Sequence, residues 1–191
     1  MKIATILGSL NKNGSCAHAL NIVHDELQNS DNTELVIIDP NDYTLPFPGQ
    51  SIPNSDESKL QHRISDVDGI IFSTPEYHGS FSSVTKLIIE NLGFPSVLSG
   101  KSVSLLGVAG GSIGAIKSLE QLRSVCSHVG SIVLPGPVSI SNVHSVFDKD
   151  GNCLDAKVEQ QLRTLANDMI KYAEKHICPE HALEEQVREN L

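Results

Sequence analysis

The chain has 191 residues, of which 39% are hydrophobic and 19% charged, and its formal net charge is −9. This length suits one domain with a sizeable hydrophobic core. The acidic balance disfavours a nucleic-acid-binding protein, because neutralising phosphates requires clustered Lys and Arg. We therefore expect no nucleic-acid partner.

The cysteines and the apolar segments point to the cytoplasm. Cys16, Cys126, Cys153 and Cys178 have no CxxC spacing, so we expect reduced thiols rather than disulfides or a metal site. The apolar stretch at the start of the sequence is too short for the hydrophobic region of a signal peptide, and no apolar stretch reaches the length of a membrane span. We expect a cytoplasmic protein without a membrane partner.

Five apolar, β-branched runs are predicted to be strands. They are nearly continuous rather than alternating, as expected for parallel strands that are buried on both faces. The third run is expected to end at Thr74, before a polar corner. The runs are residues 3–7, 34–39, 69–74, 102–109 and 131–135.

Helices are predicted between these strands, because apolar residues recur there at steps of three and four. The clearest stripes run through residues 16–27, 81–92, 119–129 and 158–172. Strand–helix alternation predicts right-handed crossovers and an open parallel sheet. We expect an α/β protein of the flavodoxin-like, three-layer α/β/α class, with a five-stranded parallel sheet of order 2-1-3-4-5.

The chain is predicted to form a single domain over residues 1–178. Residues 41–55, which contain three prolines, are expected to be a surface loop before a helix. The charged tail, residues 179–191, is expected either to form a short extra helix or to fray.

Three loops that follow strands are candidates for a ligand site. In an open α/β sheet, ligands bind beyond the carboxyl ends of the strands, at the point where the strand order reverses. The loops after Leu7, Thr74 and Val108 should meet there, and each is rich in Gly or Ser and opens a helix. They read GSLNKNGSC (8–16), PEYHGS (75–80) and AGGSIG (109–114).

The first loop resembles a phosphate-binding loop but is not a P-loop. Five residues separate Gly8 from Gly14, and Ser15 stands where that motif needs Lys. Hydroxyls and backbone N–H groups at a helix N-terminus would suit a terminal phosphate. The alternative is an ordinary turn in which Ser15 is the helix N-cap.

The second and third loops offer a flat wall and a row of donors. Pro75, Glu76, Tyr77 and His78 place an aromatic ring, a carboxylate and an imidazole at the switch point, although Glu76 could instead bond nearby backbone. Backbone N–H groups of residues 110–114 suit the electron-rich edge of a planar ring, although a tight helix entry is the alternative. Together the loops predict a mononucleotide site, and FMN is the ligand typical of such a sheet.

These motifs resemble those of the NADPH-dependent FMN reductase family, the flavodoxin-like quinone, azo-dye and chromate reductases. The matching segments are GSLNKNGSCA, PEYHGSFSSVTKLIIENL and AGGSIGAIKSLEQLR. The family's first loop carries Arg where Asn11 stands here, and its second carries Asn where His78 stands. These departures predict ordinary binding geometry with weaker FMN binding, and Lys12 is a possible substitute for the missing Arg.

The resemblance implies which residues hold the cofactor. Ser9, Asn11, Ser15 and Cys16 would contact the phosphate end. Pro75 and its three successors, Glu76, Tyr77 and His78, would lie against the isoalloxazine. The glycines of the third loop would contact the pyrimidine edge; they are Gly110, Gly111 and Gly114.

The resemblance also implies the activity. The expected enzyme passes electrons from NADPH or NADH through bound FMN to a small acceptor (a quinone, a flavin, an azo compound or a metal oxyanion) with ping-pong kinetics, and no protein residue is assigned a catalytic role. A homodimer or homotetramer that packs through the third and fourth helices is implied as well. Val84, Leu87, Ile88 and Ile89 fit such two-sided burial, or burial within one chain.

Two other functions remain open at this stage. Residues 110–114 read GxSxG between a strand and a helix, which is the context of a hydrolase nucleophile elbow at Ser112. Its triad would be completed by an Asp among Asp148, Asp155 and Asp168 and by His176 or His181. A non-catalytic FMN electron carrier would share the fold and the acidic charge.

Overall fold

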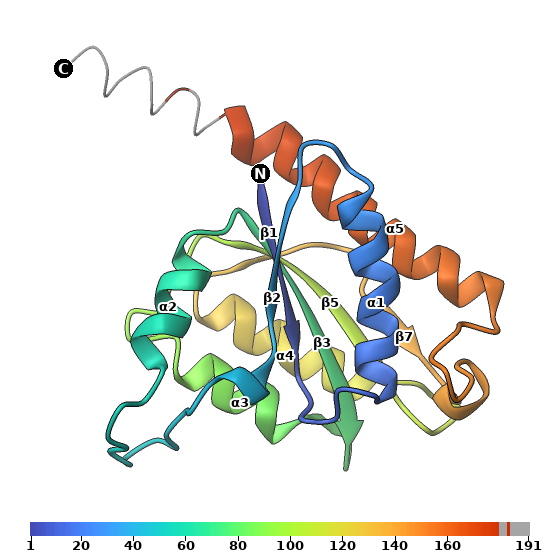
Figure 1. Ribbon diagram of the computed structural model, residues 1–191, viewed down its shortest axis with the longest axis horizontal. Coiled ribbons are helices and arrows are strands. Elements are labelled where there is room, and N and C mark those ends of the chain that lie inside the picture. Colours follow the sequence, from blue (N-terminus) through green and yellow to red (C-terminus); the bar gives the residue numbers. More distant parts are fainter. Residues whose placement is uncertain (180–182, 184–191) are drawn as a thin grey trace.

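A parallel sheet with strand order β2-β1-β3-β5-β6 forms the centre of the computed structural model, which describes residues 1–179 and 183 (Figure 1). All four neighbouring pairs along this order are parallel. The predicted α/β class and the five-position order are therefore confirmed. The strand bounds are β1 Lys2–Leu7, β2 Glu34–Ile38, β3 Gly69–Tyr77, β5 Ser102–Val108 and β6 Ile132–Val133.

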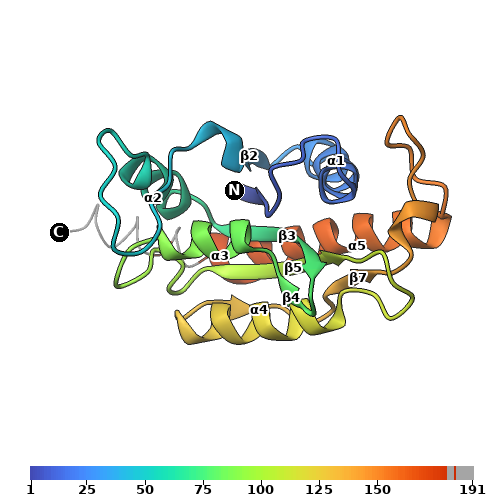
Figure 2. The same cartoon turned by 90° about the horizontal axis from the view of Figure 1, so that it is seen from below.

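Five helices flank the sheet in two layers. Figure 2 shows α1 and α4 on opposite sides of the strands. One core packs α1 and α5 on the sheet, and the other packs α2, α3 and α4 on its opposite face. The helix bounds are α1 Ser15–Gln28, α2 Glu57–Ser65, α3 Ser83–Glu90, α4 Ile116–His128 and α5 Ala156–Tyr172.

The first strand shows why the apolar runs do not alternate with polar residues. Ile3 and Leu7 of β1 belong to the core beneath α1 and α5, whereas Ala4 and Ile6 belong to the core on the other face. Successive side chains of a strand point to opposite faces, and here both faces are covered by helices. Continuous apolar character is therefore required for burial.

The predicted third strand does not end at Thr74. It continues through Pro75 to Tyr77, and Glu76 and Tyr77 pair antiparallel with β4, Ser80–Phe81. His78 and Gly79 form the turn, with φ of +52° and +73°. Positive φ at both central residues is typical of a type I′ hairpin, whose twist matches that of the flanking strands. The expected polar corner is thus a hairpin that projects from the sheet.

The predicted fifth strand at 131–135 is shortened to two residues, and a further short strand that was not expected follows it. The short β6 and β7, Val138–Ile140, both pair with β5. Pro135 and Pro137 flank Gly136, which has a φ of +77°, between the two pieces. Proline has no N–H for the strand ladder, so regular pairing is interrupted here.

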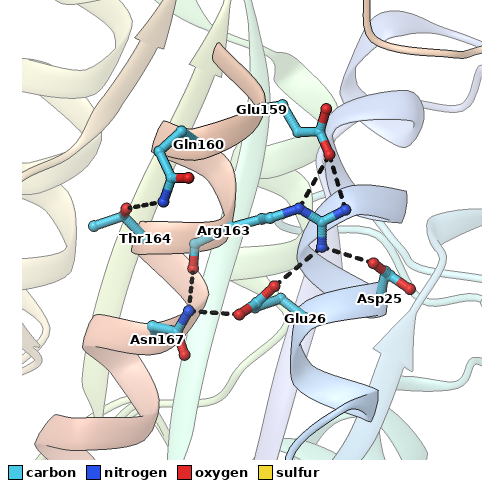
Figure 3. A network of polar contacts seen from close by, with 7 residues as sticks. All are labelled: Asp25, Glu26, Glu159, Gln160, Arg163, Thr164 and Asn167. Atoms are coloured by element: carbon cyan, nitrogen blue, oxygen red, sulfur yellow. Dashed lines mark hydrogen bonds and ion pairs between the residues drawn. The ribbon is translucent and has the colours of Figure 1, made fainter. Parts of the chain in front are cut away.

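A cluster of charges around Arg163 joins α5 to α1 (Figure 3). The Arg163 Nη1 lies 2.7 Å from Asp25 and 3.0 Å from Glu26 of α1. Its Nη2 and Nε both donate to Glu159, one turn earlier in α5. The Asn167 amide donates to Glu26 as well. Hydrogen bonds to the Asp25, Glu159 and Glu26 carboxylates raise the pKa of Arg163, so the group stays charged and fixes the helix that follows the first loop.

Several short segments complete the fold, among them a 3₁₀ helix, Val143–Ser145, that follows β7. A short 3₁₀ helix, Pro40–Asp42, leads into the loop that was expected over residues 41–55. Helix α5 continues as a π-helical stretch, Ala173–Ile177. The alternatives for the tail fall on residues 179–191, nearly all of which lie outside the described residues. No helix in the described part of the chain is long and apolar enough to cross a membrane.

Candidate functional site

A cavity of about 480 Å³ lies at the carboxyl ends of β1, β3 and β5. Its size falls within the range of small-molecule sites. The three loops that were singled out in the sequence meet there, as the rule for open α/β sheets predicts. The expected site residues that line it are Ser9, Asn11, Ser15, Cys16, Pro75, Glu76, Tyr77 and Gly110.

The first loop presents free backbone donors to the cavity. Gly14, not Ser15, is the N-cap of α1, and it makes no side-chain capping bond. Within the described residues, the N–H groups from Ser15 to Ala17 have no hydrogen-bond acceptor, since the first bond of the helix runs from His18 to Gly14 at 3.0 Å. Free N–H groups at a helix start form an anion-binding site.

Asn11 organises this loop internally. Its side-chain oxygen accepts from Asn13 N at 3.1 Å, and its backbone carbonyl accepts from Gly14 N at 3.1 Å. The Ser9 hydroxyl in turn accepts from Asn11 N at 3.2 Å. These bonds fix the conformation of the loop between Ser9 and Gly14. The side chains of Ser9 and Asn11 therefore shape the loop as well as lining the cavity.

Lys12 does not take the place of the missing Arg. Its ammonium lies 3.1 Å from an Asp39 oxygen and 3.8 Å from an Asp42 oxygen, at the end of β2. Lys12 is not among the residues that line the cavity. The Lys12 ammonium is thus ion-paired at the end of β2 rather than in the cavity.

A cluster of hydroxyls locks the first loop to the second. Gly8 N donates to Ser73 O at 2.7 Å, and the Ser82 hydroxyl donates to Gly8 O at 2.6 Å. Ser82 also caps α3 by accepting from Thr85 N at 3.0 Å, while the Thr85 hydroxyl donates to that of Thr74. A Cβ at Gly8 would lie 2.1 Å from the Thr85 Oγ1. Only glycine permits this approach.

The second loop contributes a wall of the cavity, and its carboxylate is already hydrogen-bonded within the protein. Glu76 Oε2 accepts from Ser118 N, in the first turn of α4, at 3.0 Å. The anticipated bond from Glu76 to backbone therefore exists, but its partner is 42 residues away. Tyr77 keeps 60% of its surface exposed, so an aromatic face stands at the cavity rim. His78 sits at the hairpin turn and does not line the cavity.

The third loop carries a second set of free donors. Within the described residues, the N–H groups from Gly110 to Ile113 have no acceptor, whereas Gly114 N bonds Gly111 O and Ala115 N bonds the Ser139 hydroxyl at 2.9 Å. Of the three glycines expected here, Gly110 lines the cavity, whereas Gly111 and Gly114 do not.

Sequence reasoning missed a fourth wall of the cavity, which follows β7. It includes Val143, His144, Phe147, Asp148 and Lys149, and His18 of α1 lines the cavity in contact with Phe147. The available signal was the turn-forming sequence DKDG at 148–151 after the last strand. Because that strand was expected to end at 135, this loop was not placed at the same edge of the sheet.

The alternative hydrolase triad does not form within the described residues. Ser112 has no hydrogen bond to a His or Asp in that part of the chain. Asp148 instead accepts from the backbone of its own loop, and Asp155 caps α5 by accepting from Lys157 N. His176 lies near the amino ends of the strands, since Cys178 lines a surface depression with Met1, whereas His181 lies outside the described residues.

This doubly wound sheet, with loops of free donors at its carboxyl edge, defines a flavodoxin-like protein. A flavodoxin from Bacillus cereus superposes with a TM-score of 0.62 at 14% identity, covering 90% of this chain and 99% of the flavodoxin. The sequence profile described as NADPH-dependent FMN reductase matches residues 1–145. The chain belongs to the NADPH-dependent FMN reductase family, and it is therefore an oxidoreductase of the FMN-dependent type.

Individual relatives agree with this family. A 2-hydroxy-1,4-benzoquinone reductase from Burkholderia sp. is 29% identical over 91% of this chain and 94% of its own length. An NAD(P)H-dependent FMN reductase from Pseudomonas aeruginosa is 31% identical over 64% of this chain and 67% of its own. Among solved structures, the flavoenzyme NAD(P)H:(acceptor) oxidoreductase FerB from Paracoccus denitrificans has a TM-score of 0.76 at 22% identity, covering 92% and 98% of the two chains.

Proposed function

We propose that the cavity at the strand ends holds FMN, and that the enzyme uses NADPH or NADH to reduce a small quinone-type acceptor there. The observation that carries this proposal is that the free N–H groups at the start of α1, the free donor at Gly110 and a partly exposed aromatic wall line one cavity. When bound, FMN would supply the chemistry of electron transfer between the nicotinamide nucleotide and the acceptor, while the residues of the cavity would bind and orient it.

The start of α1 suits the phosphate end of the ligand. The free N–H groups of Ser15 and Cys16 carry the positive end of the helix dipole, and the hydroxyls of Ser9 and Ser15 add donors. Burial raises the pKa of the Cys16 thiol to about 12. The thiol therefore stays protonated, and the part of Cys16 that serves the ligand is its backbone.

The other two loops suit a flat heterocycle. Pro75, Glu76 and Tyr77 form one wall of the cavity. Gly110 of the third loop also lines it, and its free N–H could donate to the ring. Gly111 and Gly114 would complete that edge with backbone contacts. The exposed Tyr77 rim leaves room on one side for the nicotinamide and then the acceptor, in keeping with ping-pong kinetics through one site.

A quinone is the favoured acceptor class. This rests on the Burkholderia relative, which matches across nearly the whole of both chains and is named for a benzoquinone substrate. A flat, neutral quinone is also compatible with a cavity whose wall offers an exposed aromatic face. Azo compounds, free flavin and metal oxyanions are the competing acceptors.

The test is turnover by the purified protein. The chain is loaded with FMN, and oxidation of NADPH and of NADH is followed with a benzoquinone, an azo dye, free FMN and chromate in parallel. We expect the highest kcat/KM with the quinone and parallel initial-rate lines. Intersecting lines would contradict a shared site, and absence of NAD(P)H turnover with every acceptor would favour an electron carrier.

We also infer a homodimer in the cytoplasm. In the single chain, Ile88 and Ile89 of α3 are buried, but Val84 and Leu87 stay half-exposed and can pack on a second copy. The four cysteines are free thiols, in keeping with a reducing compartment. Light scattering of the purified protein would measure the oligomeric state, and a monomeric mass would contradict the inferred dimer.

A further inference from the structure

We propose that Lys149, in the loop between β7 and α5, is the cation that binds the 5′-phosphate of FMN. This inference rests on the proposed FMN site and assigns a residue that lies outside the three loops recognised from the sequence. It concerns the phosphate end of the ligand only and leaves the chemistry at the ring unchanged.

Lys149 is the permanently cationic side chain that lines the cavity. Among the cavity-lining residues, all of which are described, Lys149 is the only Lys or Arg. Lys12 is paired with Asp39 and Asp42 instead. A phosphate monoester carries about −1.5 to −2 charges at neutral pH, whereas a helix start offers only about half a positive charge. The helix start therefore leaves most of the phosphate charge unbalanced. Because the chain itself has a net charge of −9, a nearby cation is needed to balance it.

The loop that carries Lys149 packs on the same turn of α1 that presents the free donors. The Phe147 ring meets the His18 ring edge to face, with centroids 5.7 Å apart. A Cβ at Gly151 would lie 2.9 Å from the His18 ring. In Figure 1 this segment lies beside the start of α1. This packing places the loop that carries Lys149 against the start of α1, and Lys149 lines the same cavity as Ser15 and Cys16.

The same loop is internally braced. Phe147 and Cys153 form an antiparallel bridge that closes residues 147–153 into a hairpin. The Asp148 carboxylate accepts from Asp150 N at 2.9 Å, from Asn152 N at 2.8 Å and from the Asn152 amide. Fixing the backbone in this way leaves only the Lys149 side chain to be ordered on binding. Within the described residues, Lys149 has no ion pair, so its ammonium is available.

The experiment compares FMN with riboflavin, which has the same ring but lacks the phosphate. Dissociation constants for both are measured by flavin fluorescence with the full-length native chain, Lys149→Gln, Lys149→Arg and, as a matched exposed lysine outside the cavity, Lys157→Gln. We expect Lys149→Gln to weaken FMN binding about tenfold and to leave riboflavin binding unchanged. Lys149→Arg and Lys157→Gln should keep the native FMN affinity. The salt dependence of FMN binding should also become shallower in Lys149→Gln.

Several results would overturn the inference. One is a native FMN affinity in Lys149→Gln, and another is an equal loss for FMN and riboflavin, which would mean that the hairpin acts on the ring or on folding. A tenfold loss in Lys12→Gln but not in Lys149→Gln would assign the role to the first loop. A raised KM for NADPH with unchanged FMN binding would assign the lysine to the nicotinamide nucleotide. If the native chain bound neither flavin, the proposed function itself would fail, which is a distinct outcome.

Discussion

The Glu76 carboxylate, at the end of β3, accepts a hydrogen bond from the Ser118 backbone N–H in the first turn of α4, with an N···O distance of 3.0 Å. The bond joins the second candidate loop to the helix that follows the third. Glu76 therefore caps α4 from outside, in place of a local N-cap side chain, since Ala115 occupies the N-cap position. A residue first considered as a ligand contact also has a structural role.

Removing this cap should destabilise the protein. We expect Glu76→Ala to lower the free energy of unfolding by about 1–2 kcal/mol, since a helix N-terminus loses its acceptor and a favourable charge. Glu76→Gln keeps an acceptor oxygen and should cost less than half of that. Urea unfolding measures both, with Glu120→Ala on the exposed side of α4 as the control. Equal stability of Glu76→Ala and the control would refute the capping role.

Gly8→Ala should be severely destabilising. The added Cβ would lie 2.1 Å from the Thr85 Oγ1 and 2.6 Å from the Ser73 carbonyl oxygen, which is backbone and cannot rotate away. We expect a loss of more than about 2 kcal/mol in unfolding free energy, as for other overpacked positions. Gly111→Ala is the matched comparison, because its Cβ would meet nothing within 4 Å. Thermal unfolding of the pair would show the contrast, and similar melting temperatures would count against it.

His78→Asn should stabilise the hairpin without changing FMN affinity. His78 has a φ of +52°, a conformation that Asn tolerates better than His, and it does not line the cavity. We expect a gain of up to about 0.5 kcal/mol and the same pH profile of FMN binding as in the native chain. A profile that flattened in His78→Asn would instead support the ring contact expected from the family resemblance.

Acid should weaken the fold through His24. Burial lowers the pKa of His24 from 6.5 to about 4, and its Nε2 lies 2.7 Å from the Thr5 hydroxyl. The folded state keeps the ring neutral while the unfolded chain takes up a proton, so stability present above pH 6.5 is lost as the pH falls toward 4. The loss at pH 4 is expected to be roughly 3 kcal/mol at most.

A comparison of variants isolates this effect from the titrating carboxylates. Urea unfolding between pH 7 and pH 4.5 should give a shallower slope for His24→Gln than for the native chain. His128→Gln, at an exposed position at the end of α4, should keep the native slope. An unchanged slope in His24→Gln would show that His24 does not couple folding to pH.

Much of this protein could be predicted from the sequence by itself. The apolar runs gave the strands and the α/β class, because burial on both faces requires continuous apolar residues. Strand–helix alternation limited the sheet to few orders, and the carboxyl-edge rule placed the loops after Leu7, Thr74 and Val108 together. These features follow from local periodicity, which a single sequence shows, and from the right-handedness of strand–helix–strand connections, which holds for nearly all proteins.

Other features were decided only by the tertiary structure. Lys12 pairs with Asp39 rather than facing the cavity, Glu76 accepts from a helix residue 42 positions away, and Lys149 lines the cavity from a loop that local patterns did not place there. Each depends on contacts between residues distant in sequence, which local patterns do not encode. Charged side chains are especially unpredictable in this respect, since a long, flexible lysine can turn toward whichever anion the fold brings near it.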